Sequence, residues 1–289
     1  MKYDLIIAGG TVVDGTGAPP KRADVAIVGD RIAAVGLDLG EAIETLDATG
    51  LLVTPGWVDI HTHYDGQVSW DSDMAPSSLH GVTTAVLGSC GVGFAPVRPE
   101  DHDRLIKIME GVEDIPGTAL AEGITWGWES FPEYMDVIDA IPHTIDLCAQ
   151  VPHDALRVYV MGDRAAFDEP ADDQDIASMQ RLLGEALDAG AFGFTTGRSD
   201  NHRSAEGLPT PASEAHASEL IGLAEVFQGR DRGVLQFVND FNILDGDEHF
   251  DREWALVEGM ARASGGRPLS LSLMQRDQSP DQWKWVLER

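Results

Sequence analysis

The stretch VDIHTHYDG, residues 58–66, contains two histidines, His61 and His63, with a single residue between them. They follow the apolar run LLVTPGWVDI, which predicts a strand. Side chains alternate between the two faces of an extended chain, so both imidazoles would point the same way. Two neutral imidazoles that converge on one point are good ligands for a transition metal. The alternative is a pair of polar residues where a strand meets solvent, and the surrounding sequence has to decide.

A cysteine follows the next predicted strand. The segment GVTTAVLGSCG, residues 81–91, brings Cys90 to the end of an apolar run, between glycines that let the backbone turn sharply. Two histidines on one strand face and a thiolate on the neighbouring strand predict a Zn²⁺ site, and the metal would keep the thiol ionised. The alternative for Cys90 is a small buried hydrophobic residue, and beside the two histidines we favour the ligand.

Two further polar residues lie close to this predicted site. Asp59 precedes His61 by two residues, so it shares the same face of the strand. A buried carboxylate there would either orient a metal ligand or bond to backbone. His153 ends the third predicted strand, in VPHDALR, and is a further candidate for the metal or the substrate.

The elements that must position these residues alternate between strand and helix from Trp57 onward. The predicted strands are residues 57–63, 81–91, 144–153, 190–198, 233–240 and 267–275. Such alternation indicates a parallel sheet, and polar residues at the carboxyl ends of short strands are typical of a barrel with its site at that face. About six strand–helix units are evident, whereas a closed barrel of this kind has eight. We therefore expect the residues that close the barrel to lie outside this sequence.

Residues 1–55 have a different pattern. Their short apolar runs are rich in Val, Ile and Thr and are interrupted by Gly, Asp and Pro, which predicts several short strands in a small β module. Their glycines do not form the G-x-G-x-x-G motif of dinucleotide-binding folds. We expect residues 56–289 to form the first part of the barrel.

Composition limits the classes of partner. The 289 residues carry 49 acidic and 20 basic side chains, for a net charge of −29, which would repel nucleic acid and anionic membranes. No apolar stretch approaches the roughly 20 residues needed to cross a bilayer, and the N-terminus does not resemble a secretory signal. Two cysteines, Cys90 and Cys148, do not make a disulfide scaffold. We expect a cytoplasmic protein with a small-molecule substrate, and homo-oligomerisation stays open.

The two motifs together resemble a known family. PGWVDIHTHYDG followed by HGVTTAVLGSCGVGFAPV is similar to the amidohydrolase superfamily and, more narrowly, to the N-acyl-D-amino-acid deacylases, or D-aminoacylases. QVPHDALRVYVMG and GAFGFTTGR resemble later segments of that family. The resemblance implies a TIM-like (β/α)8 metal-dependent hydrolase barrel, incomplete here, with a small β-sandwich domain of which residues 1–55 would be the N-terminal part.

The resemblance also implies an activity. Zinc held by His61, His63 and Cys90 would activate water to hydrolyse the amide bond of an N-acyl-D-amino acid. The family's general base, an aspartate on the eighth strand, would lie beyond residue 289, so the sequence assigns no catalytic residue. A hydrolase for cyclic amides and a barrel that has lost its chemistry are the alternatives.

The sequence departs from the family at the ends of the fifth and sixth strands, where the family has histidines. Val238 and Asn239 stand at the first position, and Leu273 and Met274 at the second. The sequence therefore predicts one zinc ion and leaves a second metal position in question. His202, just past the fourth strand, could replace a missing ligand or be an exposed loop residue.

The loop that contains His202 offers two more polar side chains, Arg198 and Asn201. A guanidinium matches the geometry of a carboxylate, so these residues are candidates for binding a substrate carboxylate.

Overall fold

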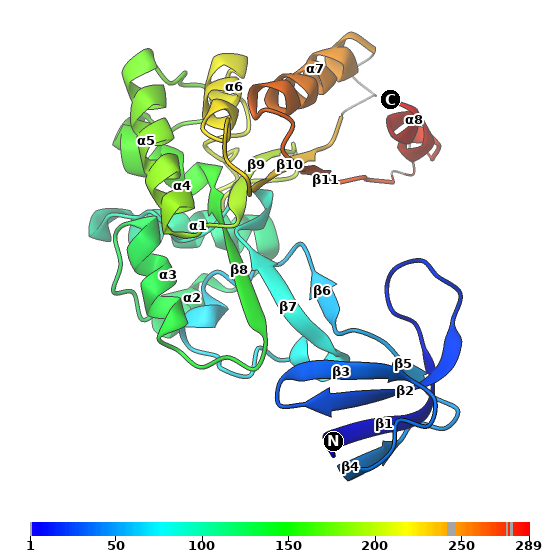
Figure 1. Ribbon diagram of the computed structural model, residues 1–289. Coiled ribbons are helices and arrows are strands. Elements are labelled where there is room, and N and C mark those ends of the chain that lie inside the picture. The colour runs from blue at the N-terminus through cyan, green and yellow to red at the C-terminus, as the bar shows by residue number, and fades with distance from the viewer. Residues whose placement is uncertain (1, 242–246, 276, 278–279) are drawn as a thin grey trace. The chain divides into compact units, whose positions relative to one another are not determined.

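The computed structural model describes residues 2–241, 247–275, 277 and 280–289 (Figure 1). Its contacts divide the chain into two compact units, residues 1–57 and 58–289.

The first unit is a five-stranded sheet with the order β3-β2-β1-β4, in which β5 also pairs with β1. β2 is antiparallel to both β1 and β3, whereas β4 and β5 run parallel to β1. Its small core contains Val12, Ala23 and Val25. The strands are β1 (Tyr3–Val12), β2 (Lys21–Val28), β3 (Arg31–Gly36), β4 (Ala42–Asp47) and β5 (Leu52–Val53).

The second unit contains a six-stranded sheet whose strands follow one another in chain order, as the strand–helix alternation predicts. Each neighbouring pair from β7 to β11 is parallel. The strands are β6 (Trp57–Asp59), β7 (Val82–Leu87), β8 (Asp146–Pro152), β9 (Gly193–Arg198), β10 (Val234–Asn239) and β11 (Leu269–Leu271).

The sheet of the second unit curls, and the side chain of Gln236 demonstrates it. Gln236 belongs to β10, yet its Nε2 lies 3.4 Å from the backbone oxygen of Ile60, which directly follows β6 at the far edge of the sheet. Such a contact requires the sheet to close part of a barrel. Gln236 therefore points into the barrel, whereas its neighbours Leu235 and Phe237, on the opposite face of the strand, are fully buried in the core.

Helices cover the outer face of this half-barrel, and α5, α6 and α7 lie side by side (Figure 1). α3 and α5 each begin with a capping box, formed by Ser130 with Glu133 and by Asp172 with Asp175. The helices are α1 (His102–Glu113), α2 (Gly117–Gly123), α3 (Phe131–Asp139), α4 (His153–Met161), α5 (Asp173–Ala189), α6 (Ala217–Glu225), α7 (Asp247–Ala263) and α8 (Gln282–Glu288).

Among the helices of the described residues, none combines the length and the apolar character that a membrane crossing requires.

Candidate metal centre

The two histidines lie beyond the end of their strand. β6 ends at Asp59, so His61 and His63 belong to the turn that follows it, and not to a strand running to residue 63 as the sequence predicts. The residue between them keeps the turn beside β7, because both the backbone N–H and the hydroxyl of Thr62 donate to the carbonyl oxygen of Val86, at 3.0 and 2.7 Å. The Asp59 carboxylate accepts the backbone N–H of His61 at 3.2 Å, which is the backbone bond that was one of its two predicted roles.

Cys90 is buried in a tight turn directly after β7 and has a left-handed backbone, with φ +59°. Few residues other than glycine adopt this conformation, so the surroundings must hold it. Its N–H donates to Gln236 Oε1 at 3.3 Å, and the next N–H, of Gly91, donates to Thr195 Oγ1 at 3.0 Å. A Cβ on Gly91 would lie 2.9 Å from the backbone nitrogen of Gly197, so glycine is needed there for the turn to approach β9.

His61, His63 and Cys90 come together. His61 Nε2 lies 3.2 Å from Cys90 Sγ, and one ligand atom from each of the three residues lies within 4.8 Å of the others. The two imidazole centroids are 5.3 Å apart. Zinc binds imidazole nitrogen at about 2.0–2.1 Å and thiolate sulfur at about 2.3 Å, so small side-chain movements would let one ion contact all three.

The protonation states of these residues suit a cation. Burial, helped by His61 and His202, lowers the pKa of His63 to about 3, and burial also lowers the pKa of His61. Both imidazoles are therefore neutral at pH 7 and have a lone pair to offer. Burial raises the pKa of the Cys90 thiol, and the carboxyl groups of Glu113 and Asp65 raise it further. The thiol consequently ionises only if a positive charge is supplied, as a bound metal would do.

Two carboxyl groups at this site escaped the sequence analysis. Glu113, the last residue of α1, places Oε1 3.2 Å from His63 Nε2, and burial raises its pKa to about 7. Asp65 is buried, and its burial raises its pKa to about 7 as well. Asp65 follows His63 by two residues and could have been noticed by the same alternation, whereas no local pattern in the sequence connects Glu113 with His63.

His202 lies beside the three residues without joining them. The electrostatic influence of His61, after burial, lowers its pKa, and a Cβ on Gly197 would lie 3.3 Å from its Nδ1. That nitrogen is buried and has no hydrogen-bond partner within the described part of the chain. His202 is therefore a half-buried residue at the site, not a freely exposed loop residue.

His153 is placed differently. It is fully buried at the start of α4, and both ring nitrogens are occupied, Nδ1 at 2.8 Å from Thr196 Oγ1 and Nε2 at 2.9 Å from Glu219 Oε1. Arg157, also fully buried, lies 3.3 Å from the same carboxylate oxygen. Both ring nitrogens therefore face protein partners, and His153 lies in a buried polar network outside the group of His61, His63 and Cys90.

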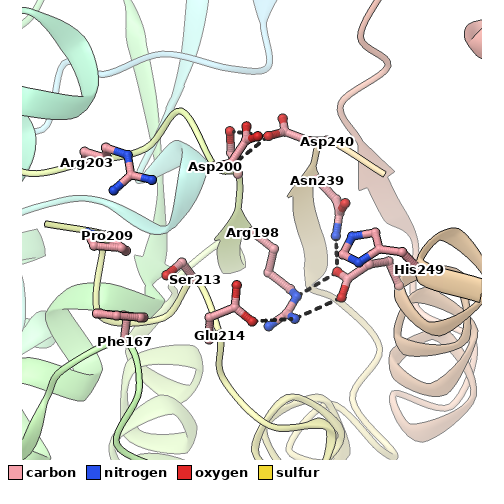
Figure 2. Close-up of a pocket in the computed structure, with 12 residues that line it drawn as sticks. Phe167, Arg198, Asp200, Arg203, Pro209, Ser213, Glu214, Asn239, Asp240 and His249 are labelled. Atoms are coloured by element: carbon pink, nitrogen blue, oxygen red, sulfur yellow. Dashed lines mark hydrogen bonds and ion pairs between the residues drawn. The ribbon is translucent and has the colours of Figure 1, made fainter. Parts of the chain in front are cut away.

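The Arg198 guanidinium is also occupied. Its Nε and Nη2 donate to the two oxygens of Glu253 at 2.8 and 2.9 Å, and Nη1 donates to the carbonyl oxygen of Ala215 at 2.9 Å. Arg198 and Glu253 both line a cavity of about 200 Å³, and Figure 2 shows Arg198 at its wall. Asn201 is exposed and is not among the residues that line this cavity. The two residues predicted to bind a substrate carboxylate are therefore not brought together.

The strand ends where the family has histidines hold other contacts. Asn239, at the end of β10, donates its amide to Glu253 and accepts the N–H of Phe241 at 2.5 Å. Val238 is buried in the core. Leu273 and Met274 follow β11, and Leu273 is 43% exposed.

Comparison with known proteins shows which family the chain is similar to. The sequence model of the Amidohydrolase family matches residues 44–287. The chain is 36% identical to a D-aminoacylase of Alcaligenes xylosoxydans xylosoxydans over 221 residues, which is 76% of this chain and 41% of that protein. The chain spans about two fifths of the length of this relative and of two related deacylases from the same organism.

Solved structures of D-amino-acid deacylases are also similar to this chain. A crystal structure of D-aminoacylase superposes with a TM-score of 0.77 at 30% identity, over 99% of this chain and 55% of that one. The N-acyl-D-glutamate deacylase of Bordetella bronchiseptica, complexed with zinc and a phosphonate that mimics the tetrahedral intermediate, superposes with a TM-score of 0.71 at 28% identity, over 100% and 56%. Together with the curled parallel sheet, these neighbours confirm the predicted TIM-like hydrolase barrel, of which the described residues hold six strands.

Proposed function

The chain belongs to the amidohydrolase family, and from that premise we propose that the protein carrying it is a metal-dependent hydrolase of amide bonds other than peptide bonds. The observation that carries the proposal is the group of His61, His63 and Cys90. Two neutral imidazoles and a thiol that ionises only beside a cation have little structural reason to converge, whereas they are the ligands that zinc prefers.

We assign one zinc ion to this group. When bound, zinc lowers the pKa of water and polarises a carbonyl oxygen, which is the chemistry that amide hydrolysis needs. His61 and His63 would supply lone pairs, and Cys90 would supply a soft anionic ligand held in place by its bond to Gln236. A second ion would lack the histidines that the family has at the ends of the strands corresponding to β10 and β11. Asn239, at the end of β10, instead donates a hydrogen bond to Glu253.

The substrate class that fits is an N-acylated D-amino acid. Relatives described as D-aminoacylase, N-acyl-D-aspartate deacylase and N-acyl-D-glutamate deacylase share 34–36% identity with 76–79% of this chain. His202 belongs to the loop that follows β9, and other residues of the same loop, Ser199, Asp200 and Arg203, line the cavity beside Arg198. We do not assign the general base to a residue of this chain.

The test is metal content and turnover of the full-length protein. We expect about one zinc per chain after purification without added metal. Turnover of N-acetyl-D-amino acids should exceed that of the L-isomers and of a hydantoin, should disappear after treatment with a chelator, and should return with Zn²⁺. Protein that takes up no zinc, or that retains full turnover after the metal is removed, would refute the proposal.

A further inference from the structure

Four ionisable side chains are buried together where α4 meets α6. They are His153, Asp154 and Arg157 from the first five residues of α4, and Glu219 from α6, and none is more than 1% exposed. Burial of such groups is costly, and well-packed apolar residues in place of a buried ion pair are often as stabilising or more so. Stability of the fold is therefore a weak reason for this network, and its further contacts indicate another.

The network holds the backbone of the connection between β9 and α6, residues 199–216. Arg157 Nη1 donates to the carbonyl oxygen of Pro211 at 2.6 Å, and the Asp154 carboxylate accepts the N–H of Ala212, also at 2.6 Å. Hydrogen bonds to charged groups are stronger than those between neutral groups. These two bonds therefore attach the later part of the connection firmly to α4.

The elements on both sides of this connection are bound to the same network. His153 Nδ1 lies 2.8 Å from Thr196 Oγ1 in β9, and its Nε2 lies 2.9 Å from Glu219 Oε1 in α6. Arg157 Nε lies 3.3 Å from the same carboxylate oxygen. α4 therefore holds the strand before the connection, the helix after it and the backbone within it.

The same stretch of chain borders the group of His61, His63 and Cys90. A Cβ on Gly197, the penultimate residue of β9, would lie 2.2 Å from the backbone oxygen of Cys90, so the end of the strand touches the turn that carries the cysteine. A few residues into the connection, His202 lies close enough to His61 for the two imidazoles to influence each other electrostatically. A displacement of the connection would therefore change the surroundings of the three grouped residues without removing any of them.

We propose that His153, Asp154, Arg157 and Glu219 are positioning residues of the hydrolase, which hold the β9–α6 connection in place beside the metal centre. They contribute no ligand to the group of three and act through the connection. A functional site needs a supporting shell of contacts that fixes the groups around it, and this network supplies one from α4. The inference rests on the proposed function, because it requires that substrate binds and reacts beside this connection.

The experiment compares Asp154→Leu with a matched control, Asp154→Asn, in the full-length protein. Both substitutions remove the carboxylate and keep a side chain of similar size, but only asparagine keeps an oxygen that can accept the N–H of Ala212. Zinc content, kcat and KM are measured, with the N-acetyl-D-amino acid that the wild type hydrolyses fastest as substrate. Amide hydrogen exchange is followed in residues 199–216 and, for comparison, in α3, which lies outside the network.

We expect Asp154→Leu to raise KM about tenfold with little change in kcat, because substrate binding must then order a connection that is no longer held in place. Hydrogen exchange in residues 199–216 should be about tenfold faster, while exchange in α3 and zinc content stay at the wild-type values. Asp154→Asn should remain within about twofold of wild type in every measurement, which a role of the charge alone would not allow.

Faster exchange of the connection with unchanged KM would show that the network serves the fold alone, and unchanged exchange would show that it does not hold the connection. Either result would overturn the inference and leave the proposed function standing. If Asp154→Leu accelerates exchange in α3 as well, the double variant Arg157→Met, Glu219→Gln is measured in the same way, since it removes one buried charge of each sign. Equal acceleration in both regions there would also overturn the inference. A wild-type protein that hydrolyses none of these substrates would refute the proposed function, and the inference with it.

Discussion

Two polar clusters lie at the carboxyl ends of the barrel strands, and they differ in how far their hydrogen bonds are satisfied. The first, the metal cluster, consists of His61, His63 and Cys90 after β6 and β7. The second, the arginine cluster, consists of Arg198, Glu253 and Asn239 around the ends of β9 and β10. In the metal cluster His63 Nδ1 is buried without a partner in the described structure, whereas in the arginine cluster the guanidinium fork is filled by one carboxylate.

The difference distinguishes a group of residues that could bind a ligand from a group that stabilises the fold. Buried polar groups are normally hydrogen-bonded, so a buried imidazole nitrogen without a partner calls for an explanation such as an ion or a substrate. A bidentate guanidinium–carboxylate pair needs no ligand, because each charge already neutralises the other. Residue type alone made Arg198, like the metal cluster, a candidate for function, and the hydrogen bonds of the two clusters distinguish them. Four variants test whether this distinction holds.

The largest effect is expected from the metal cluster. The double variant His61→Ala, His63→Ala should lose zinc and at least about a thousandfold in amidase activity, because a metal supplies several kcal/mol of transition-state stabilisation. Zinc analysis and turnover check this, with the exposed His80→Ala as the control. Normal zinc content in the double variant would show that the two imidazoles are not ligands.

The arginine cluster should respond in stability and not in metal content. Glu253→Ala leaves the Arg198 guanidinium buried, 11% exposed, without its fork partner, which should lower the free energy of unfolding by about 3 kcal/mol. Urea unfolding measures this change, and zinc content should stay at the wild-type value. A variant that unfolds at the wild-type denaturant concentration but loses zinc would reverse the roles of the two clusters.

A smaller effect is expected from Cys90→Ser. A hydroxyl is a poor substitute for a thiolate ligand, so Zn²⁺ affinity should fall roughly 10- to 100-fold, and the sulfur-to-metal charge-transfer band of the Co²⁺-loaded protein should disappear. Serine is close to cysteine in size, so the unfolding midpoint of the metal-free protein should change little. If affinity and spectrum were both unchanged, Cys90 would be a packing residue, the alternative that the sequence left open.

The sequence predicted the contacts between residues on consecutive strands, because such strands are also neighbours in the sheet. The order of the parallel strands follows from alternation of strand and helix, and residues 58–66 and 81–91 point to the metal cluster because adjacent strands carry both motifs. Contacts between distant segments could not be predicted in this way. Glu113 reaches His63 only because of how α1 packs.

Two other residues illustrate the same limit. The side chains that occupy His153 and Arg198 lie 66 and 55 residues further along the chain, on helices whose packing the sequence does not specify. Their partners, Glu219 and Glu253, are single acidic residues in a chain with 49 of them, so no local pattern marks them out. Both residues therefore remained candidates for function until their hydrogen bonds were known.

The smallest effect is expected at Gln236, which belongs to β10 like Asn239 but serves the metal cluster. Its Oε1 accepts the N–H of Cys90 at 3.3 Å, and its Nε2 donates to the oxygen of Ile60 at 3.4 Å, so one amide links both arms that carry the ligands. Both distances are at the long end for hydrogen bonds, and each such bond contributes about 0.5–1.5 kcal/mol.

Gln236→Met keeps the length of the side chain and removes both of these bonds together with the one that Oε1 accepts from Thr195 Oγ1 at 3.3 Å, and we therefore expect a loss of about 1 kcal/mol in the free energy of unfolding. Zn²⁺ affinity should fall by a few-fold, because Cys90 would no longer be held in its left-handed conformation. Gln228→Met is the control, since its exposed amide donates to Ala263 away from both clusters. A loss of stability with unchanged Zn²⁺ affinity would give Gln236 a structural role alone, like that of the arginine cluster. A loss of both would show that β10 supports the metal cluster through Gln236 and the arginine cluster through Asn239.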